Sequence, residues 1–213
     1  MFPLKDENPT ELRPHVTYML IAANAIVFLC SIALGPDHFV SIVQGYGAIP
    51  SRIVHGSDVH TLLTSMFLHA GWIHLIGNCW FLYIFGDNIE DVCGHARFVA
   101  FYFTCGILAH FLHIASNTSS TIPAIGASGA ISGILGAYIL LYPKARVLTL
   151  VTLGYFWRIV RVPSILFLGL WFLLQLFNGV LGAAAGITAG VAYWAHIGGF
   201  LAGIALIYLF KKK

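Results

Sequence analysis

Most of this chain consists of apolar segments long enough to cross a lipid bilayer. The hydrophobic fraction is 59% and the charged fraction is 9%, whereas soluble domains average roughly 45–50% and about 25%. Such a chain has too little polar surface to cover a soluble globule. The composition therefore predicts an all-α polytopic membrane protein, because a helix satisfies its own backbone hydrogen bonds in lipid.

Six segments meet the length requirement of a transmembrane helix, which is about 20 residues for roughly 30 Å of hydrocarbon. We place the six helices at 16–36, 60–86, 95–114, 128–143, 163–181 and 191–210. The segment 37–59 has apolar residues among Gly and Pro and is expected to lie in the membrane interface. The segment 144–162 mixes apolar and basic residues and is expected to form a surface turn or hairpin.

The distribution of basic residues predicts the orientation of the helices. If the N-terminus is inside, all of the Lys and Arg residues except Arg52 fall on the cytoplasmic side. This agrees with the general excess of Lys and Arg in the cytoplasmic loops of membrane proteins. Both termini are therefore expected in the cytoplasm. We expect a polar tail at 1–15 and a single six-helix membrane domain at 16–213, since no linker-like segment divides it.

Several classes of partner are not indicated. The net charge of +3 does not suggest nucleic acid, because the basic residues are scattered between apolar segments. The four cysteines form no C-x-x-C pair, and no H-E-x-x-H motif is present, so neither a metal nor another cofactor is expected. His110 and His113 share a helix face and would suit a metal, but without a third ligand we favour two interfacial histidines.

Two motifs of small residues place a serine and a histidine in apolar segments. The motif GASG at 126–129 contains Ser128, and the motif AHIGG at 195–199 contains His196. Serine and histidine are the two side chains that nucleophilic acyl transfer requires. Alone, either residue is more often structural, a helix cap or a packed histidine.

The polar residues of three predicted helices come out at a similar depth. At a rise of ~1.5 Å per residue, Ser128 and His196 each lie about 22 Å from the expected cytoplasmic end of their helix. His74 and Asn78 lie about 24 and 18 Å from the end of theirs. Polar groups are costly at this depth unless they are partnered or hydrated, so their convergence predicts a site.

Glycine spacing predicts that two of these helices touch. Gly129 and Gly133 form one G-x-x-x-G pair, followed by Gly136, and Gly199 and Gly203 form another. Such faces let transmembrane backbones approach closely. The contact would bring the serine and the histidine within hydrogen-bonding distance.

Together these motifs resemble those of the rhomboid intramembrane serine proteases of the basic six-span type. The motif GASG matches the nucleophile motif of that family, and AHIGG matches its base motif. HLIGN at 74–78 matches H-x-x-x-N, and GDNIEDVCG at 86–94 is similar to the G-x-x-x-E-x-x-x-G segment. The resemblance extends from about residue 60 to about residue 203.

The resemblance implies a role for each residue. Ser128 would be the nucleophile and His196 the general base, while His74, Asn78 and the Ser128 backbone N–H would stabilise the oxyanion. A Ser-His dyad is expected rather than a triad, since no acidic residue lies at the depth of His196. The partners implied are transmembrane protein substrates in the lipid bilayer.

The implied function is cleavage of single-span membrane proteins in or near the transmembrane segment, and a prokaryotic plasma membrane is the expected location. The alternative is a non-proteolytic rhomboid-like protein that binds membrane clients for quality control. That alternative would be indicated by loss of the serine or the histidine, and neither is lost. A transporter is a third possibility, although no inverted halves are apparent.

Access to such a site requires a moving part. The segment 181–190 is expected to be a cap that lifts, because Gly182, Gly186 and Gly190 give it little packing. The helix expected at 163–181 contains Trp171, Phe172, Gln175 and Phe177. These side chains are interpreted as lipid-facing or packing residues, with a lateral substrate gate as the alternative.

Three further residues receive structural interpretations. Glu90 is expected to be a cap or hydrogen-bonding residue at the cytoplasmic boundary, and His69 an orienting or loop contact. Ser132 stands where some rhomboids carry a tyrosine that stacks on the base. The stacking partner of His196 therefore cannot be the one found in those members.

Overall fold

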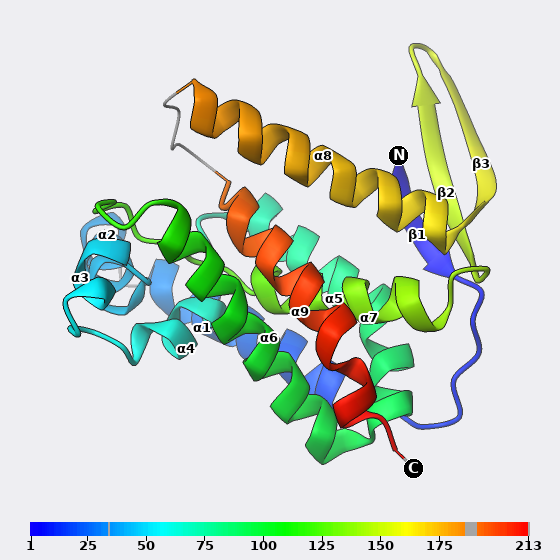
Figure 1. The fold of residues 1–213 in the computed structure, drawn as a ribbon, viewed down its shortest axis with the longest axis horizontal. Coiled ribbons are helices and arrows are strands. Elements are labelled where there is room, and N and C mark those ends of the chain that lie inside the picture. The colour runs from blue at the N-terminus through cyan, green and yellow to red at the C-terminus, as the bar shows by residue number, and fades with distance from the viewer. Residues whose placement is uncertain (34, 186–190, 213) are drawn as a thin grey trace.

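The computed structural model describes residues 1–33, 35–185 and 191–212, which are largely helical (Figure 1). The long helices are α1 (His15–Ala33), α5 (Trp72–Cys93), α6 (His95–Ser116), α7 (Ser128–Leu141), α8 (Ser164–Ala184) and α9 (Tyr193–Phe210). The shorter helical elements are α2 (Pro36–Tyr46), α3 (Pro50–Val54), α4 (Thr61–Thr64) and the 3₁₀ turn η1 (Ser65–Phe67). The strands are β1 (Phe2–Asp6), β2 (Arg146–Leu153) and β3 (Phe156–Pro163).

The predicted helical membrane fold is confirmed. Helices α1, α6, α8 and α9 have both the length and the mean hydropathy to cross a membrane, and α7 is a shorter apolar helix. Helix α5 is equally long, but its last two turns contain Asp87, Glu90 and Asp91. The expected interfacial segment 37–59 is occupied by α2 and α3.

The predicted bounds of the helix at 60–86 are wrong at both ends. The chain forms only the short turns α4 and η1 before Leu68 becomes extended, and α5 begins at Trp72. It continues to Cys93, where Gly94 ends it with a φ of 74°, a backbone angle that glycine adopts without strain. Apolar Met66, Phe67 and Leu68 have the hydropathy of a membrane helix, although the first two belong to the short turn η1 and Leu68 is extended.

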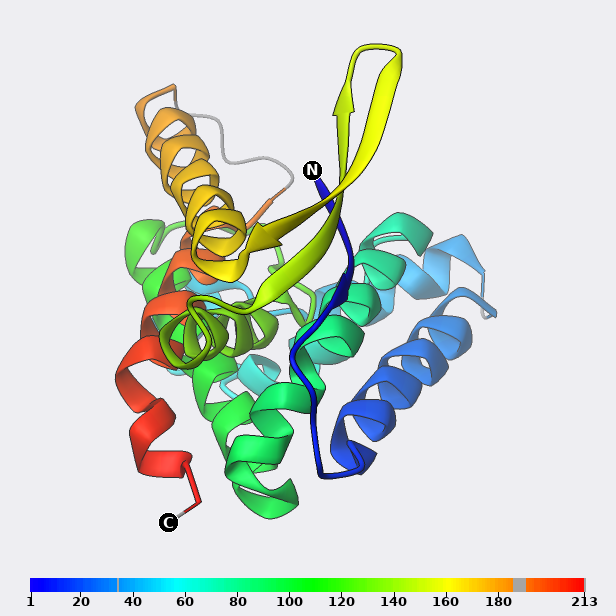
Figure 2. The ribbon, with the colours of Figure 1, turned by 90° about the vertical axis from the view of Figure 1, so that its right-hand side faces the viewer.

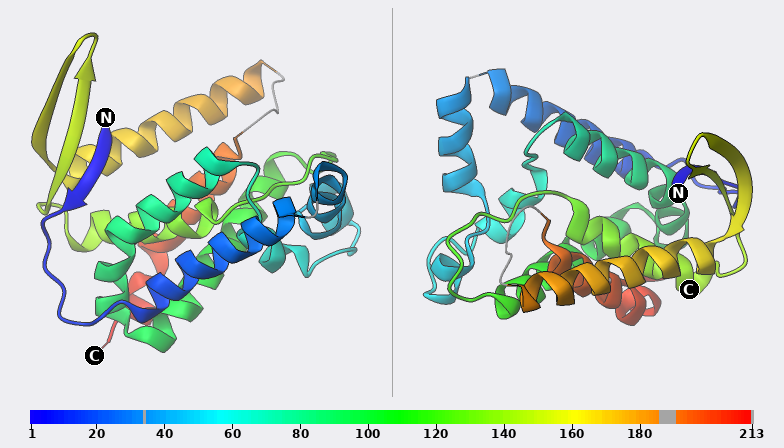
Figure 3. Two further views of the ribbon diagram at one scale, coloured as in Figure 1. Left: turned by 180° about the vertical axis from the view of Figure 1, so that it is seen from behind. Right: turned by 90° about the horizontal axis from the view of Figure 1, so that it is seen from above.

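Helix α7 lies at the centre of the bundle. Its residues from Gly129 to Tyr138 are all buried, as expected for a helix that is surrounded by others. Helices α1 and α8 lie at opposite edges, with α5 and α7 between them (Figures 2 and 3). The element that carries Ser128 is thus held from several sides, whereas α8 is the least buried of the four long apolar helices.

Glycines bring the backbones of α7 and α9 into direct contact. A Cβ added to Gly199 would lie 1.9 Å from the Gly129 carbonyl oxygen, and one on Gly203 would lie 1.9 Å from that of Gly133. A Cβ on Gly136 would lie 2.0 Å from the carbonyl oxygen of Phe200. The close approach predicted from the G-x-x-x-G spacing is therefore confirmed.

Glu90 joins the end of α5 to the start of α1. Its carboxyl oxygens accept hydrogen bonds from the backbone N–H groups of Val16 and Thr17, at 2.9 and 2.8 Å, and from the Thr17 hydroxyl at 2.7 Å. These N–H groups are among the first of the helix, which have no partner within it. The structural role expected for Glu90 is confirmed.

The segment 144–162 forms the expected hairpin, and β1 adds to it in the order β1-β2-β3. Part of the polar tail is thus a strand. Asp6 at its end accepts hydrogen bonds from Asn88 on α5 and Tyr138 on α7, both at 2.8 Å. Burial raises the pKa of the Asp6 carboxyl. The pairing of β1 with this hairpin is an addition to the helical fold that the sequence did not indicate.

Replacement of Gly203 by alanine should destabilise the protein, because the new methyl group would collide with the α7 backbone. We expect Gly203→Ala to reduce the free energy of unfolding by about 1–3 kcal/mol, the usual effect of overpacking. The control is Gly169→Ala in α8, where an added Cβ meets nothing within 4 Å. Thermal unfolding in detergent measures both, and equal midpoints would contradict the contact.

Candidate active site

Ser128 and His196 meet where α7 and α9 begin. Ser128 is the first residue of α7, and His196 lies in the first turn of α9. The Nε2 atom of His196 is 2.8 Å from the Ser128 hydroxyl oxygen. The glycine contact between the two helices continues from this point, so backbone packing holds the pair together. The sequence-predicted meeting of the two residues is therefore found.

The second ring nitrogen of His196 has a partner on a third helix. The amide oxygen of Gln175 on α8 lies 3.0 Å from His196 Nδ1. The sequence interpretation treated Gln175 as a packing or gate residue and missed this contact. A signal was available, because Gln175 lies 12 residues from Pro163, or about 18 Å along a helix, close to the expected depth of His196.

Aromatic packing on His196 also comes from α8. The ring of Trp171 is 6.1 Å from the imidazole, tilted by 31°, within the range of aromatic contacts. Ser132 donates its hydroxyl to the Ser128 carbonyl oxygen at 2.7 Å. Trp171 thus contacts the ring that a tyrosine at position 132 would have covered, and Ser132 bonds to its own helix.

His74 and Asn78, one turn apart on α5, face the loop that leads to Ser128. A Cβ built on Gly126 would lie 2.7 Å from His74 Nε2 and 3.6 Å from Asn78 Nδ2. His74 Nδ1 accepts the Ala70 N–H at 3.3 Å, which assigns the ring proton to Nε2 in the neutral form. Asn78 Nδ2 is buried with no partner among the described residues. Both side chains thus present donors beside Ser128.

These groups border one large cavity. It has a volume of about 830 Å³ and is lined by Ser128, His196, His74, Asn78 and Gln175, together with apolar residues of α5, α7 and α8. Ligand pockets of this size are usually apolar with a few placed polar groups. The cavity lies between α5 and α8, so these two helices flank any route into it from the side.

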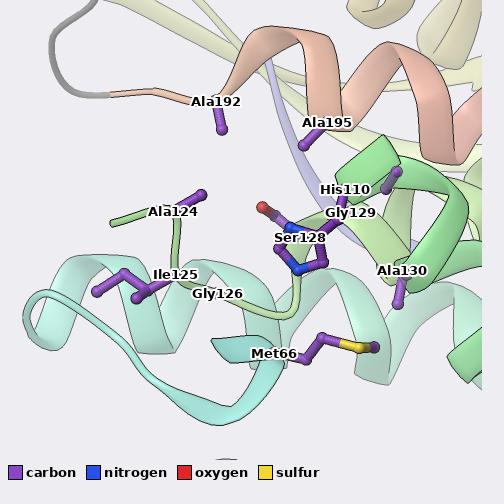
Figure 4. Close-up of a pocket in the computed structure, with 12 residues that line it drawn as sticks. Met66, His110, Ala124, Ile125, Gly126, Ser128, Gly129, Ala130, Ala192 and Ala195 are labelled. Atoms are coloured by element: carbon purple, nitrogen blue, oxygen red, sulfur yellow. The ribbon is translucent and has the colours of Figure 1, made fainter. Parts of the chain in front are cut away.

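A second, small cavity lies behind Ser128 (Figure 4). Its volume of about 10 Å³ is close to what one water molecule needs. His110, which lines it, is buried and lies 3.0 Å from the Ser65 hydroxyl oxygen through Nε2. The ring of His110 therefore packs inside the bundle, and its position at the membrane interface stays a prediction.

His69 occupies the extended segment before α5, as a loop contact. Its ring is 5.0 Å from the ring of His74, and its Nδ1 is 3.2 Å from the Phe67 carbonyl oxygen. Among the described residues, no group of three or more His, Cys, Asp or Glu side chains is placed to hold one metal ion.

The gate residues are only partly described. Phe172 stacks on Phe200 of α9 with ring centroids 4.5 Å apart. Gly182 lies in the last turn of α8, which continues to Ala184 rather than ending at 181. Gly186 and Gly190 lie outside the described residues, and so does the second half of the cap expected at 181–190.

Comparison with known proteins adds to this geometry. The family model described as the rhomboid domain matches residues 56–213. The chain is 32% identical over 142 residues to rhomboid protease GluP of Bacillus subtilis (strain 168), a match that covers 67% of this chain and 27% of that protein. The matched part therefore spans little more than a quarter of that relative.

Relatives also occur in organelles. RHOMBOID-like protein 11, chloroplastic, of Arabidopsis thaliana is 27% identical over 98% of this chain and 70% of its own length. Presenilin-associated rhomboid-like protein, mitochondrial, of Rattus norvegicus is 31% identical over 60% of this chain and 33% of its own length. A membrane protein is supported, but the expected prokaryotic plasma membrane is not.

Gly126 should not tolerate a side chain. Its φ is 120°, which strains any residue with a Cβ, and the added Cβ would strike the His74 ring. We expect Gly126→Ala to reduce the free energy of unfolding by about 1–3 kcal/mol. Gly71→Ala is the control, since Gly71 is extended and open. Thermal unfolding of both variants checks this, and an unchanged midpoint for Gly126→Ala would contradict it.

Proposed function

Because the chain belongs to the rhomboid family, we propose that it is a serine endopeptidase that cleaves transmembrane protein substrates in or near their membrane-spanning segment. Ser128 is the nucleophile and His196 the general base. The observation that carries the proposal is the contact of 2.8 Å between His196 Nε2 and the Ser128 hydroxyl, at the wall of a cavity with room for an extended peptide segment.

The first half of the reaction forms an acyl-enzyme. The Ser128 oxygen attacks the scissile carbonyl carbon while His196 Nε2 takes the hydroxyl proton. The resulting tetrahedral intermediate collapses, the C–N bond breaks, and His196 returns the proton to the departing amine. The short contact means that the proton transfer needs no rearrangement of either side chain.

Three donors are positioned for the oxyanion. The Ser128 backbone N–H lies at the N-terminus of α7, where N–H groups have no intrahelical partner and the helix dipole favours negative charge. His74 Nε2–H and Asn78 Nδ2–H lie beside the same loop. Because Asn78 Nδ2 has no partner among the described residues, it can donate to the developing charge without first breaking a hydrogen bond.

The second half of the reaction is hydrolysis of the ester. A water molecule attacks the acyl carbon with His196 again as base, and Ser128 regains its proton. A substrate helix cannot present a carbonyl that is bonded within its own backbone, so the scissile segment must unwind on entry. Substrates with small or helix-breaking residues near the cleavage site fit this requirement.

We propose that both termini face the cytoplasm and that the site is closer to the opposite surface, as the basic residues favour. The membrane domain comprises residues 16–213, and the tail comprises 1–15. Trp171 lines the side of the cavity formed by α8, and Phe172, the next residue of that helix, packs on α9. We propose these two side chains as the lateral gate. Their ring contacts with His196 and Phe200 support this assignment.

Removal of either member of the dyad should abolish catalysis. We expect Ser128→Ala and His196→Ala each to reduce cleavage of a single-span reporter to background, and the double variant to be no worse, because the two residues act as a unit. A fluorophosphonate probe should label the wild-type protein in detergent and should not label Ser128→Ala. Thermal unfolding of each variant provides the control for folding.

Retained cleavage by purified Ser128→Ala would disprove the proposal. A client-binding protein without protease activity gives a different result, because it would bind membrane proteins equally well with or without Ser128. Binding of the reporter to wild type and Ser128→Ala, measured in parallel with cleavage, separates the two functions.

Loss of an oxyanion donor should affect turnover more than affinity. We expect Asn78→Ala and His74→Ala each to lower kcat by about 10-fold or more, with little change in KM, because the charge exists mainly in the transition state. Reporter cleavage at varied substrate concentration measures both constants. If a variant kept full kcat but lost thermal stability, that residue would have a structural role only.

A further inference from the structure

Gln175 is a polar residue on the inner face of an apolar helix. Along α8, the less exposed residues 171, 172, 175, 178 and 179 share one side, whereas Leu173, Leu174 and Phe177 are exposed. This spacing is that of a single helix face. The Gln175 amide therefore faces the site, and its oxygen is 3.0 Å from His196 Nδ1.

We infer, on the basis of the proposed function, that Gln175 is a positioning residue that holds His196 in its productive tautomer. It acts through His196 and does not touch the reacting atoms. Because Gln175 belongs to α8, which borders the substrate cavity, the orientation of the base depends on how α8 packs.

The tautomer follows from the chemistry of the amide. A carbonyl oxygen can only accept, so Nδ1 of His196 must carry the proton, and Nε2 is left as the acceptor for the Ser128 hydroxyl. The opposite tautomer would place the proton on Nε2, where it would prevent proton removal from Ser128. The two contacts, at 3.0 and 2.8 Å, therefore select the form that can act as a base.

A neutral acceptor suits this location. A carboxylate beside His196 would stabilise the imidazolium more strongly, but desolvation of an isolated charge is expensive in a membrane helix. An amide directs the ring and assigns its proton at a much lower desolvation cost. Within the described residues, Gln175 is the single hydrogen-bond partner of Nδ1. It is thus an uncharged third member of the hydrogen-bonded series Ser128–His196–Gln175.

The dependence on α8 follows from its contacts. The helix is the least buried of the four long apolar helices, and beside Gln175 it packs on α9 through Trp171 and Phe172. A hydrogen bond weakens steeply beyond about 3.5 Å. An outward movement of α8 that widens the cavity would therefore break the hydrogen bond to His196 Nδ1. Return of α8 would restore the hydrogen bonds that join Gln175, His196 and Ser128.

The test uses the full protein in lipid vesicles with a fluorescent single-span reporter, and it follows kcat, KM and the rate of fluorophosphonate labelling. Gln175→Met keeps the length of the side chain but removes the acceptor. We expect it to lower kcat and the labelling rate by about 10-fold or more, as for loss of base orientation. KM and the thermal midpoint should stay close to the wild-type values.

Rescue by a conservative change distinguishes positioning from packing. Gln175→Glu retains an acceptor oxygen and should keep kcat within about 3-fold of the wild type. Leu173→Ala, a change on the exposed side of α8, controls for general loosening of the helix and should leave kcat unchanged. Equal losses in Gln175→Met and Gln175→Glu, or an unchanged kcat in Gln175→Met, would overturn the inference.

The dependence on α8 is tested by a double variant. Phe172→Ala removes the stacking on Phe200 and should also lower kcat, but it should add little to the loss in Gln175→Met, because both act through His196. Fully additive losses would overturn the dependence on α8. The two claims can fail separately. If Ser128→Ala abolishes cleavage but Gln175→Met remains fully active, the proposed function stands and this inference is rejected.

Discussion

The backbone contact between α7 and α9 is the constraint on which the rest of the site depends. Gly199 and Gly203 leave room for the carbonyl oxygens of Gly129 and Gly133, so the two helices approach without intervening side chains. In lipid there is no hydrophobic force to hold helices together, and close packing must supply the attraction. Rigid contact over two turns then places the first residue of α7 beside the first turn of α9.

Polar contacts at the helix ends hold the surrounding helices in place. Glu90 caps the start of α1 from the end of α5, and Asp6 joins the small sheet to α5 and α7. Each of these carboxyl groups meets backbone or side-chain donors, which offset part of the cost of its burial. The bundle is thus rigid around Ser128, whereas α8 has no comparable polar anchor to α9 among its described contacts except Gln175.

The apolar segments predicted the helices because hydrophobic length is a strong constraint in membranes. The spacing of glycines also predicted the α7–α9 contact, and equal depth predicted that Ser128 and His196 would meet. Hydropathy does not predict the structure of 60–71, where buried Met66 and Leu68 belong to short turns and an extended segment rather than to a continuous helix. The distance of Gln175 from Pro163 indicates the depth of its side chain, but no local pattern indicates which face of an isolated apolar helix turns inward, so its contact with His196 was not predicted.

An amide as the third member of the array is consistent with the surroundings of the site. In a soluble hydrolase, a buried carboxylate that orients the histidine also stabilises the imidazolium that forms. Here the ring lies beside Trp171 and Ser128, in a cavity lined mostly by apolar residues, where an additional charge would have few donors to compensate it. A neutral group can orient the His196 ring, and the helix that carries this group, α8, also lines the substrate cavity. Admission of a substrate and alignment of the base are then two consequences of one packing interface, between α8 and α9.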